Sequence, residues 1–296
     1  MSVRVALVTA SMARAFDEDM EPLVAALRSV GAKVSVLDWD DAEADWTIAD
    51  VTVVRSPWDY SLRRDEFLTW ARRAGASTRL VNPPDVLEWN TDKRYLAELA
   101  GWGVPVVPTR FFALGDEIDL AEDGELVVKP TVSAGSRDTA RYSAGRRDAA
   151  IAHVAELLEQ GREVMVQPYL SSVDERGETA MICFAGEHSH AISKGPLLPL
   201  DGEATRASFA EEHIAACAPS EDEIALADAV LAALPAVGPA GAGPSGLCYA
   251  RIDVVHGDDG TAMVLEVELC EPAVFLDTAP GSADRFATAI LSQAAR

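Results

Sequence analysis

The sequence predicts a protein of mixed α/β and α+β class, in which a small N-terminal unit with a parallel sheet precedes two further units. Apolar strands alternate with amphipathic helices up to the break Asn82-Pro-Pro-Asp85, which is the pattern of a parallel sheet flanked by helices. Beyond this break, strands, helices and a hairpin follow in a less regular order. A chain of 296 residues that is 49% apolar can bury two or three cores of this kind.

The N-terminal unit, residues 1–88, is predicted from apolar runs bounded by turn residues and from helical periodicity. In its first helix Met20, Leu23 and Leu27 share one side, and Gly31 ends the helix. Strands are expected at 3–9, 33–38, 50–54 and 79–82, with helices at 17–30 and 66–75.

The same reasoning divides the rest of the chain into a central unit, residues 89–170, and a C-terminal unit, residues 171–296. For the central unit we expect a helix at 93–101, a strand at 125–130, a loop of small residues at 131–144, a helix at 146–160 and a strand at 163–170. For the C-terminal unit we expect strands at 178–184 and 188–193, a helix at 221–234, a loop at 238–244 and a final hairpin with strands at 247–255 and 261–269.

This final hairpin, with its turn at 257–260, carries most of the functional information. Because side chains alternate along a strand, Arg251 and Asp253 share one face, as do Glu266 and Glu268 on the next strand. If the two faces coincide, three carboxylates converge. Such crowding is unfavourable unless a cation neutralises it, and oxygen ligands suit Mg²⁺, which keeps waters and phosphates in its shell. The alternative is an exposed acidic sheet face.

A second pattern concerns lysines close to small residues. Lys129 ends an apolar strand just before the loop 133–136, Ser-Ala-Gly-Ser, whose small side chains let backbone N–H groups approach an anion. Lys93 lies at a predicted helix start. The P-loop motif G-x-x-x-x-G-K-[ST] is absent, and a surface turn with an incidental lysine is the alternative for either position.

The order of these features along nearly the whole chain resembles the ATP-grasp superfamily of carboxylate–amine ligases. That family encloses ATP between two α+β subdomains, and an N-terminal α/β domain supplies part of the substrate site. The resemblance implies Mg²⁺ and ATP as cofactors. The phosphate-binding residues that it implies are Lys93, Lys129, Ser133, Gly135 and Ser136.

For the adenine edge, the resemblance implies Gln167 and Pro168 with the backbone of Tyr169 and Leu170, and for the ribose it implies Glu178. The implied metal ligands are Asp253, Glu266 and Glu268, and the implied catalytic residues are Arg251, at the acyl phosphate and tetrahedral intermediate, and Lys194, whose role stays open. Two positions depart from the family pattern. Gln167 stands where glutamate is usual, although its carbonyl can still accept from an amino group. Glu268 stands where asparagine is usual.

Three further segments are similar to a subgroup that includes the O-ureido-serine cyclo-ligase of D-cycloserine biosynthesis. They are Val54-Arg-Ser-Pro-Trp-Asp-Tyr60, His190-Ala-Ile-Ser-Lys194 and Glu266-Val-Glu-Leu-Cys-Glu-Pro-Ala273. The first segment offers Arg55, Trp58 and Tyr60 as substrate residues. Arg55 follows a buried strand and is equally well explained as a structural ion-pair partner, and the aromatic pair as packing residues.

The resemblance implies an enzyme that activates a carboxylate as acyl phosphate and forms a C–N bond, by cyclisation of O-ureido-D-serine to D-cycloserine. An amino acid or peptide amide ligase is the alternative within the class, and a catalytically silent nucleotide-binding protein is the alternative outside it. The substrate is then a small amino acid.

Composition excludes other classes of partner. A net charge of −23 argues against nucleic acid and anionic membranes, and no apolar run is long enough to span a bilayer. Four cysteines without C-x-x-C pairing are typical of buried thiols in a reducing cytoplasm. The sequence does not decide between a monomer and a homo-oligomer.

Overall fold

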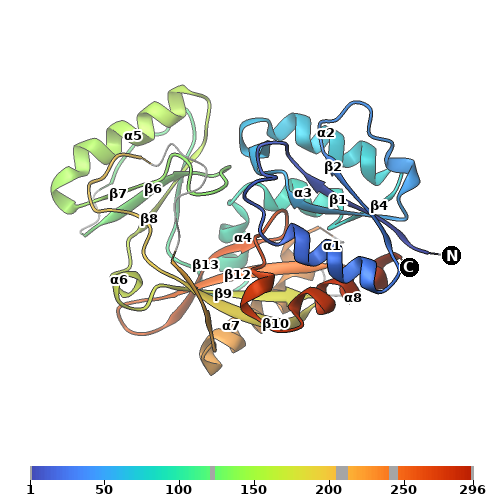
Figure 1. Ribbon diagram of the computed structural model, residues 1–296. Coiled ribbons are helices and arrows are strands. Elements are labelled where there is room, and N and C mark those ends of the chain that lie inside the picture. Colours follow the sequence, from blue (N-terminus) through green and yellow to red (C-terminus); the bar gives the residue numbers. More distant parts are fainter. Residues whose placement is uncertain (1, 121–123, 205–212, 240–245, 295–296) are drawn as a thin grey trace.

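The computed structural model describes residues 2–120, 124–204, 213–239 and 246–294, and their strands form three sheets (Figure 1). The loop predicted at 238–244 lies mostly outside the described residues. Figure 1 shows the N-terminal and central sheets side by side, with the C-terminal sheet beneath both in this view. None of the helices in the described ranges combines the length and apolarity that crossing a bilayer requires.

The N-terminal sheet is parallel, with strand order β2-β1-β3-β4, as the alternating pattern predicts. Its strands are β1 Arg4–Thr9, β2 Lys33–Asp38, β3 Val51–Ser56 and β4 Arg79–Val81. Its helices are α1 Met20–Ser29, α2 Arg64–Gly75 and α3 Pro84–Asn90, with 3₁₀ turns η1 Trp46–Ile48 and η2 Trp58–Leu62. Helix α3 begins within the segment that we expected only to break the chain, because a proline is well placed in the first turn of a helix.

The central sheet is antiparallel, with strand order β5-β8-β6-β7, and α5 covers one of its faces. Its elements are α4 Tyr95–Gly101, β5 Arg110–Phe112, β6 Leu126–Pro130, β7 Ala140–Tyr142, η3 Ala144–Arg146, α5 Arg147–Glu159 and β8 Val164–Pro168. Strand β7 corrects the prediction of a continuous loop at 131–144. All three of its residues are buried against β6, although the arginine at its centre made the segment look exposed.

The C-terminal sheet is antiparallel, with strand order β11-β10-β9-β12-β13. Its elements are α6 Ser172–Arg176, β9 Glu178–Phe184, β10 Glu187–Lys194, β11 Ile214–Cys217, α7 Glu221–Val237, β12 Tyr249–His256, β13 Ala262–Glu268, η5 Leu276–Thr278 and α8 Ser282–Ala294. The predicted hairpin is confirmed, and helices α4 and α7 share the core on one face of this sheet.

Helix α8, which the sequence analysis missed, packs between two sheets. Its apolar side joins one core with α1, with the N-terminal sheet and with the second face of the C-terminal sheet. Within this core Phe286 stacks on Phe184, with ring centroids 4.5 Å apart. The last helix of the chain therefore belongs to the joint between the N-terminal and C-terminal units, as Figure 1 shows by placing α8 beside α1.

Two buried asparagines hold the N-terminal half of the chain to the end of the hairpin. The Asn82 amide donates to the carbonyls of Tyr249 (3.0 Å) and Leu269 (2.7 Å), and its oxygen accepts from Cys248 N at 2.7 Å. The Asn90 amide donates to Val267 O at 2.8 Å, and its oxygen accepts from Leu269 N at 2.6 Å. Because these bonds are directional, they fix where β13 lies.

We therefore expect Asn82→Ala and Asn90→Ala to lower the free energy of unfolding by at least about 2 kcal/mol, since each backbone group left unpaired in the core costs about 1–3 kcal/mol. Urea unfolding followed by circular dichroism measures the loss. Gln160→Ala, an amide truncation at an exposed position, is the matched control and should change stability by less than about 0.5 kcal/mol. Equal stability of all three variants would contradict this account of the joint.

Candidate active site

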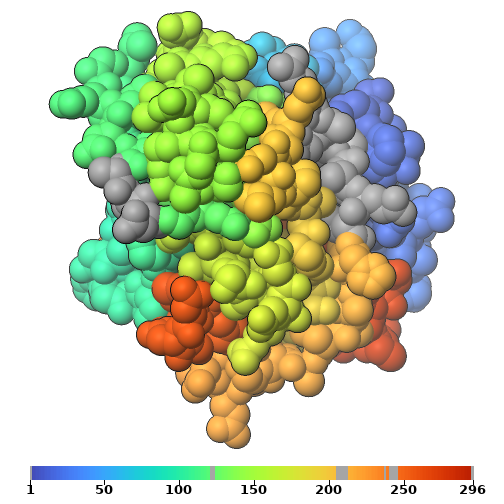
Figure 2. All heavy atoms as spheres, turned by 90° about the vertical axis from the view of Figure 1, so that its left-hand side faces the viewer, coloured from blue at the N-terminus to red at the C-terminus, as the bar shows by residue number. Residues whose placement is uncertain are grey.

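A cavity of about 440 Å³ is lined by residues of all three units. The central sheet contributes Lys129 and Gln167, and the C-terminal sheet contributes the polar face of the hairpin. The segment 195–204 runs from β10 back to the central unit, where Leu200 bridges to Arg141. Figure 2 shows this yellow-orange segment against the green central unit. The cavity is therefore enclosed between two sheets and one connecting segment.

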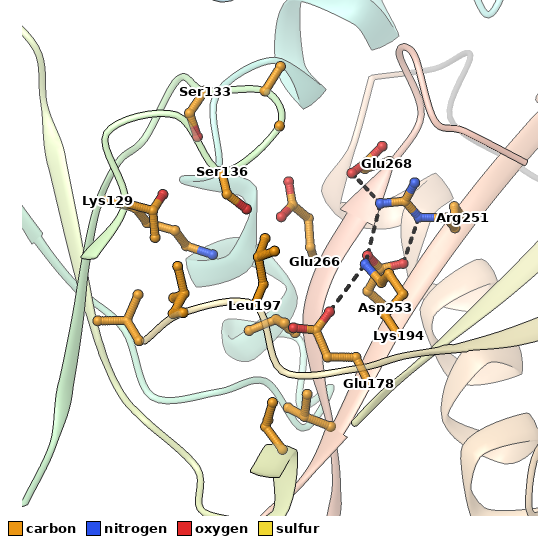
Figure 3. Close-up of a pocket in the computed structure, with 18 of the residues that line it drawn as sticks. Lys129, Ser133, Ser136, Glu178, Lys194, Leu197, Arg251, Asp253, Glu266 and Glu268 are labelled. Carbon is orange, nitrogen blue, oxygen red and sulfur yellow. Dashed lines mark hydrogen bonds and ion pairs between the residues drawn. The ribbon is translucent and has the colours of Figure 1, made fainter. Parts of the chain in front are cut away.

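The hairpin register brings its charged residues together. Asp253 lies directly opposite Glu266, and Arg251 lies opposite Glu268, so the two polar faces coincide as the alternation predicts. The Arg251 guanidinium binds both oxygens of Asp253, at 2.8 and 2.9 Å, and also contacts Glu268. Figure 3 shows this cluster on one wall of the cavity.

Lysines from other elements complete the cluster. Lys194 at the end of β10 places its Nζ 2.6 Å from Asp253 and 3.1 Å from Glu178. Lys93, just before α4, places its Nζ 2.9 Å from Glu266 and donates to the carbonyl of Ser133 at 2.9 Å. Asp253, Glu266 and Glu268 thus each contact a cation that a different strand or turn supplies.

The carboxylates respond differently to burial. Burial opposes ionisation of Asp253 and Glu266, yet neighbouring cations lower the pKa of both: Arg251 and Lys194 act on the first, and Lys93 on the second. Burial and the adjacent carboxylates raise the pKa of Glu268 to about 8 despite its contact with Arg251. Glu268 is therefore the carboxylate of this cluster whose ionisation is least favoured when no further cation is bound.

This donor set fits a hard divalent cation that shares its shell with other ligands. Among the described residues, no group of three or more His, Cys, Asp or Glu side chains is arranged to hold a metal by itself. The three hairpin carboxylates are instead turned toward Arg251, Lys194 and Lys93. Oxygen donors of this kind suit Mg²⁺, which completes its coordination with waters and phosphate oxygens.

The opposite wall carries Lys129 and the loop that follows β6. Figure 3 shows Lys129, Ser133 and Ser136 facing the carboxylates across the cavity. Gly135 and Ser136 both have positive φ, at 61° and 55°, which turns the backbone sharply at the tip of the loop. Burial lowers the pKa of Lys129, so this ammonium is costly to keep charged without an anion.

The predicted adenine residues line the cavity at the end of β8 and just after it, together with Val107, Val127 and Val173. Gln167 donates its amide N–H to Thr109 Oγ1 at 2.9 Å, which directs its carbonyl oxygen to other donors. Pro168, Tyr169 and Leu170 all line the cavity. The backbone N–H of Tyr169 donates to Glu125 O at 2.9 Å, so its carbonyl oxygen is the backbone group that it would offer to a ligand.

Arg141, which the sequence analysis did not single out, supports this end of the cavity. Its guanidinium carbon lies 3.4 Å from the centroid of the Tyr169 ring, and it binds the carboxylates of Glu125 and Asp174. Asp174 in turn accepts from the Tyr169 hydroxyl at 2.7 Å. These contacts come from three elements, so no local sequence pattern could reveal them.

Of the three predicted substrate residues, only Trp58 lines the cavity. Arg55 is fully buried and does not line the cavity; it donates to Pro272 O at 3.2 Å and lies 3.4 Å from Asp19. This placement favours the structural ion pair, the alternative that the sequence left open. Trp58 lines the cavity and donates to Glu271 O at 3.1 Å, whereas Tyr60 is buried behind the cavity wall.

Asp19 is a buried carboxylate that the sequence analysis missed. It accepts from the backbone N–H groups of Val274 (2.7 Å), Phe275 (3.2 Å) and Leu276 (2.7 Å). The carbonyl just before them, that of Ala273, accepts from Arg251 at 3.2 Å. Asp19 therefore fixes the segment that contacts Arg251. From the sequence alone, an aspartate just before a helix is interpreted as an ordinary N-cap, so this role was not predicted.

Three sheets around a cavity lined by lysines and hairpin carboxylates define an ATP-grasp ligase. The fold matches a D-alanine–D-alanine ligase from Bacillus anthracis solved with ATP, with a TM-score of 0.68 at 14% identity over 100% of this chain and 98% of that one. It also matches the ATP-grasp ligase PsnB solved with Mg and ADP, with a TM-score of 0.62 at 18% identity over 99% of this chain and 98% of that one.

More similar proteins define the family. The chain is 42% identical to the cycloserine biosynthesis protein DcsG of Streptomyces lavendulae over 96% of its own length and 97% of that protein. A crystal structure of D-cycloserine synthetase DcsG matches at 40% identity with a TM-score of 0.88, over 98% of this chain and 99% of that one. Residues 5–82 match the model of the DcsG N-terminal domain. The chain belongs to the D-cycloserine synthetase DcsG family.

Proposed function

We propose that this ligase uses Mg²⁺ and ATP to activate the carboxylate of O-ureido-D-serine and closes the ring of D-cycloserine. The observation that carries the proposal is the arrangement of Lys93, Lys129 and Arg251 around three hairpin carboxylates in a cavity shared by all three units. Membership of the DcsG family supports the substrate. Ligation of a separate amine is the competing outcome within the same class.

Each proposed nucleotide-binding group lies on the cavity wall. Gln167, with the backbone of Tyr169 and Leu170, would meet the adenine edge, and Glu178 would meet the ribose. Lys93, Lys129 and the loop 133–136 would bind the phosphates. Asp253, Glu266 and Glu268 would hold Mg²⁺, which when bound neutralises phosphate charge.

The chemistry requires positioning and charge neutralisation more than acid–base groups. A substrate carboxylate oxygen attacks the γ-phosphorus and ADP leaves. The ureido nitrogen bonded to oxygen then attacks the acyl carbon, loses its proton, and expels phosphate as the five-membered ring closes. Hydrolytic loss of the carbamoyl group from that nitrogen gives the ring N–H of cycloserine. Arg251, held by Asp253 and by the carbonyl of Ala273, would stabilise the developing oxyanion.

The first prediction concerns the metal ligands. Glu266→Gln and Asp253→Asn should reduce turnover by orders of magnitude at ordinary Mg²⁺, because each removes a charge that the metal requires. Steady-state ADP formation across a Mg²⁺ titration measures this loss. Asp258→Asn removes the same charge from the exposed turn of the same hairpin and should leave activity nearly unchanged.

Stability must be followed in parallel by thermal unfolding, because Asp253 also pairs with Arg251 and Lys194. If folded Glu266→Gln retains near-native activity at ordinary Mg²⁺, the assignment of the metal site is wrong.

The second prediction separates the two phosphate lysines. Lys93→Met and Lys129→Met should each weaken ATP binding by about 1.5–3 kcal/mol, the contribution of a charge-assisted hydrogen bond. Only Lys93→Met should destabilise the protein without ligand. The Lys93→Met substitution leaves Glu266 and the Ser133 carbonyl without the ammonium that they contact. No carboxylate of the described residues lies within 4.0 Å of the Lys129 ammonium, so Lys129→Met breaks no ion pair.

Isothermal titration with ATP and Mg²⁺, together with urea unfolding of the free protein, measures both effects. Lys33→Met, on an exposed strand position, is the control. Unchanged ATP affinity in both cavity variants would contradict the assignment of Lys93 and Lys129 as phosphate-binding residues.

The third prediction tests cyclisation itself. With O-ureido-D-serine and Mg-ATP alone, the protein should form ADP, phosphate and a cyclic product, because a tethered nitrogen has an effective concentration that a free amine cannot match. Product mass and ADP release measure this. Arg251→Ala should lower kcat far more than ATP affinity. Amide formation only after a second amino acid is added, with no cyclic product, would move the assignment to the amide ligase.

A further inference from the structure

Glu271 is a buried acidic residue of the cavity that the proposed chemistry does not use. It follows β13 by three residues, is 7% exposed and lines the cavity beside Trp58. Trp58 fixes its backbone by donating from Nε1 to Glu271 O at 3.1 Å. Two independent segments, one from the N-terminal unit and one from the hairpin, therefore meet at this residue.

Glu271 differs from the neighbouring carboxylates in that it has no close cation among the described residues. Asp253, Glu266 and Glu268 each contact a lysine or arginine. Among the described residues, no lysine, arginine or histidine nitrogen lies within 4.0 Å of the Glu271 carboxylate. Burial accordingly raises the pKa of Glu271. A buried carboxylate without a cation is costly, and a cationic ligand would offset that cost.

The surroundings hold this carboxylate in place. The Tyr60 hydroxyl and the Cys270 thiol are the nearby donors that act to lower the pKa of this carboxyl, against the effect of its burial, and both groups are buried. Tyr60 is itself packed against Phe67, with ring centroids 5.4 Å apart. A rigid, oriented carboxylate at the wall of a cavity is the arrangement that recognises a single charged group of a ligand.

The substrate class supplies one such group. An amino acid whose carboxylate is phosphorylated still carries its α-ammonium, which must enter the cavity with a partner or lose hydration without compensation. The hairpin carboxylates are committed to cations and to the proposed metal. We infer that Glu271 binds the α-ammonium of the amino acid substrate, with Tyr60 as a positioning residue behind it. This inference rests on the proposed function, because it concerns the same cavity and the same substrate class.

The test compares two substrates in two proteins. One is O-ureido-D-serine, and the other is its des-amino analogue, 3-(ureidooxy)propanoate, which lacks only the ammonium. Glu271→Gln keeps the size of the side chain and its contact with Tyr60 while removing the charge. We expect it to raise KM for the amino acid by about 10–100-fold, as loss of a charge-assisted hydrogen bond does, with KM for ATP unchanged. For the analogue, kcat/KM should be the same in both proteins.

Further variants guard the interpretation. Glu18→Gln removes an exposed acid that also lines the cavity and should leave both substrates unaffected. Tyr60→Phe should raise KM for the amino acid, less than Glu271→Gln does, and should leave the analogue unaffected. Thermal unfolding reports folding of each variant. If Glu271→Gln does not fold, Glu271→Asp, which keeps the charge at a shorter reach, carries the same comparison with an intermediate loss.

The outcomes distinguish this inference from the proposed function. If wild-type protein gives no cyclic product, the proposed function fails, and the comparison is repeated with whichever amino acid supports ADP formation and its des-amino form. An equal loss for both substrates, an unchanged KM in Glu271→Gln, or a selective loss in Glu18→Gln instead would each overturn the role of Glu271.

Discussion

The structure depends on neutralising three carboxylates that one hairpin places on a single face. Asp253 is buried, Glu266 and Glu268 are half-buried, and the three cannot all ionise side by side unless cations approach them closely. Those cations come from separate parts of the chain: Lys93 precedes α4, Lys194 ends β10, and Arg251 lies on β12. The packing of the units against one another therefore also brings these cations to the carboxylates. In the proposed function, Mg²⁺ and phosphates would exchange with these ion pairs, so binding would move the lysines away from their present carboxylate partners.

Precision of that docking comes from polar contacts more than from the cores. Apolar burial is strong but non-directional, so the shared cores hold the units together without specifying the register between them. Asn82 and Asn90 specify it for β13, and Asp19 specifies it for the segment 274–276. Each of these side chains bonds backbone groups that lie far away in sequence. The position of Arg251 is thus set by residues that touch no ligand.

The parts of the site that the sequence predicted were those that local rules determine. Alternation along two strands and a turn rich in glycine and aspartate were enough to predict the hairpin and the shared faces of its charged residues. The pairing of Asp253 with Glu266, on which their convergence depended, is given by the register of the structure. Contacts between the units could not be predicted from the sequence. Arg55 was ambiguous because its partners, Asp19 and Pro272, come from two distant segments. Strand β11 was missed because a four-residue edge strand becomes regular only against its neighbour β10. Helix α8 was missed although its periodic apolar residues are typical of a helix.

The distribution of basic residues connects the site to the whole chain. The sequence contains only four lysines, and three of them, Lys93, Lys129 and Lys194, line the cavity. Among the described arginines, Arg251 is the one that lines the cavity, and several others form ion pairs elsewhere. The division is physically reasonable, because an ammonium is a compact charge on a flexible stem that can follow a phosphate, whereas a guanidinium suits fixed bidentate pairing. With a net charge of −23, the protein repels anions at a distance, and salt screens that repulsion within about 10 Å at 0.1 M. In the proposed function, short-range attraction by the cavity lysines would hold a nucleotide against the repulsion of the whole molecule.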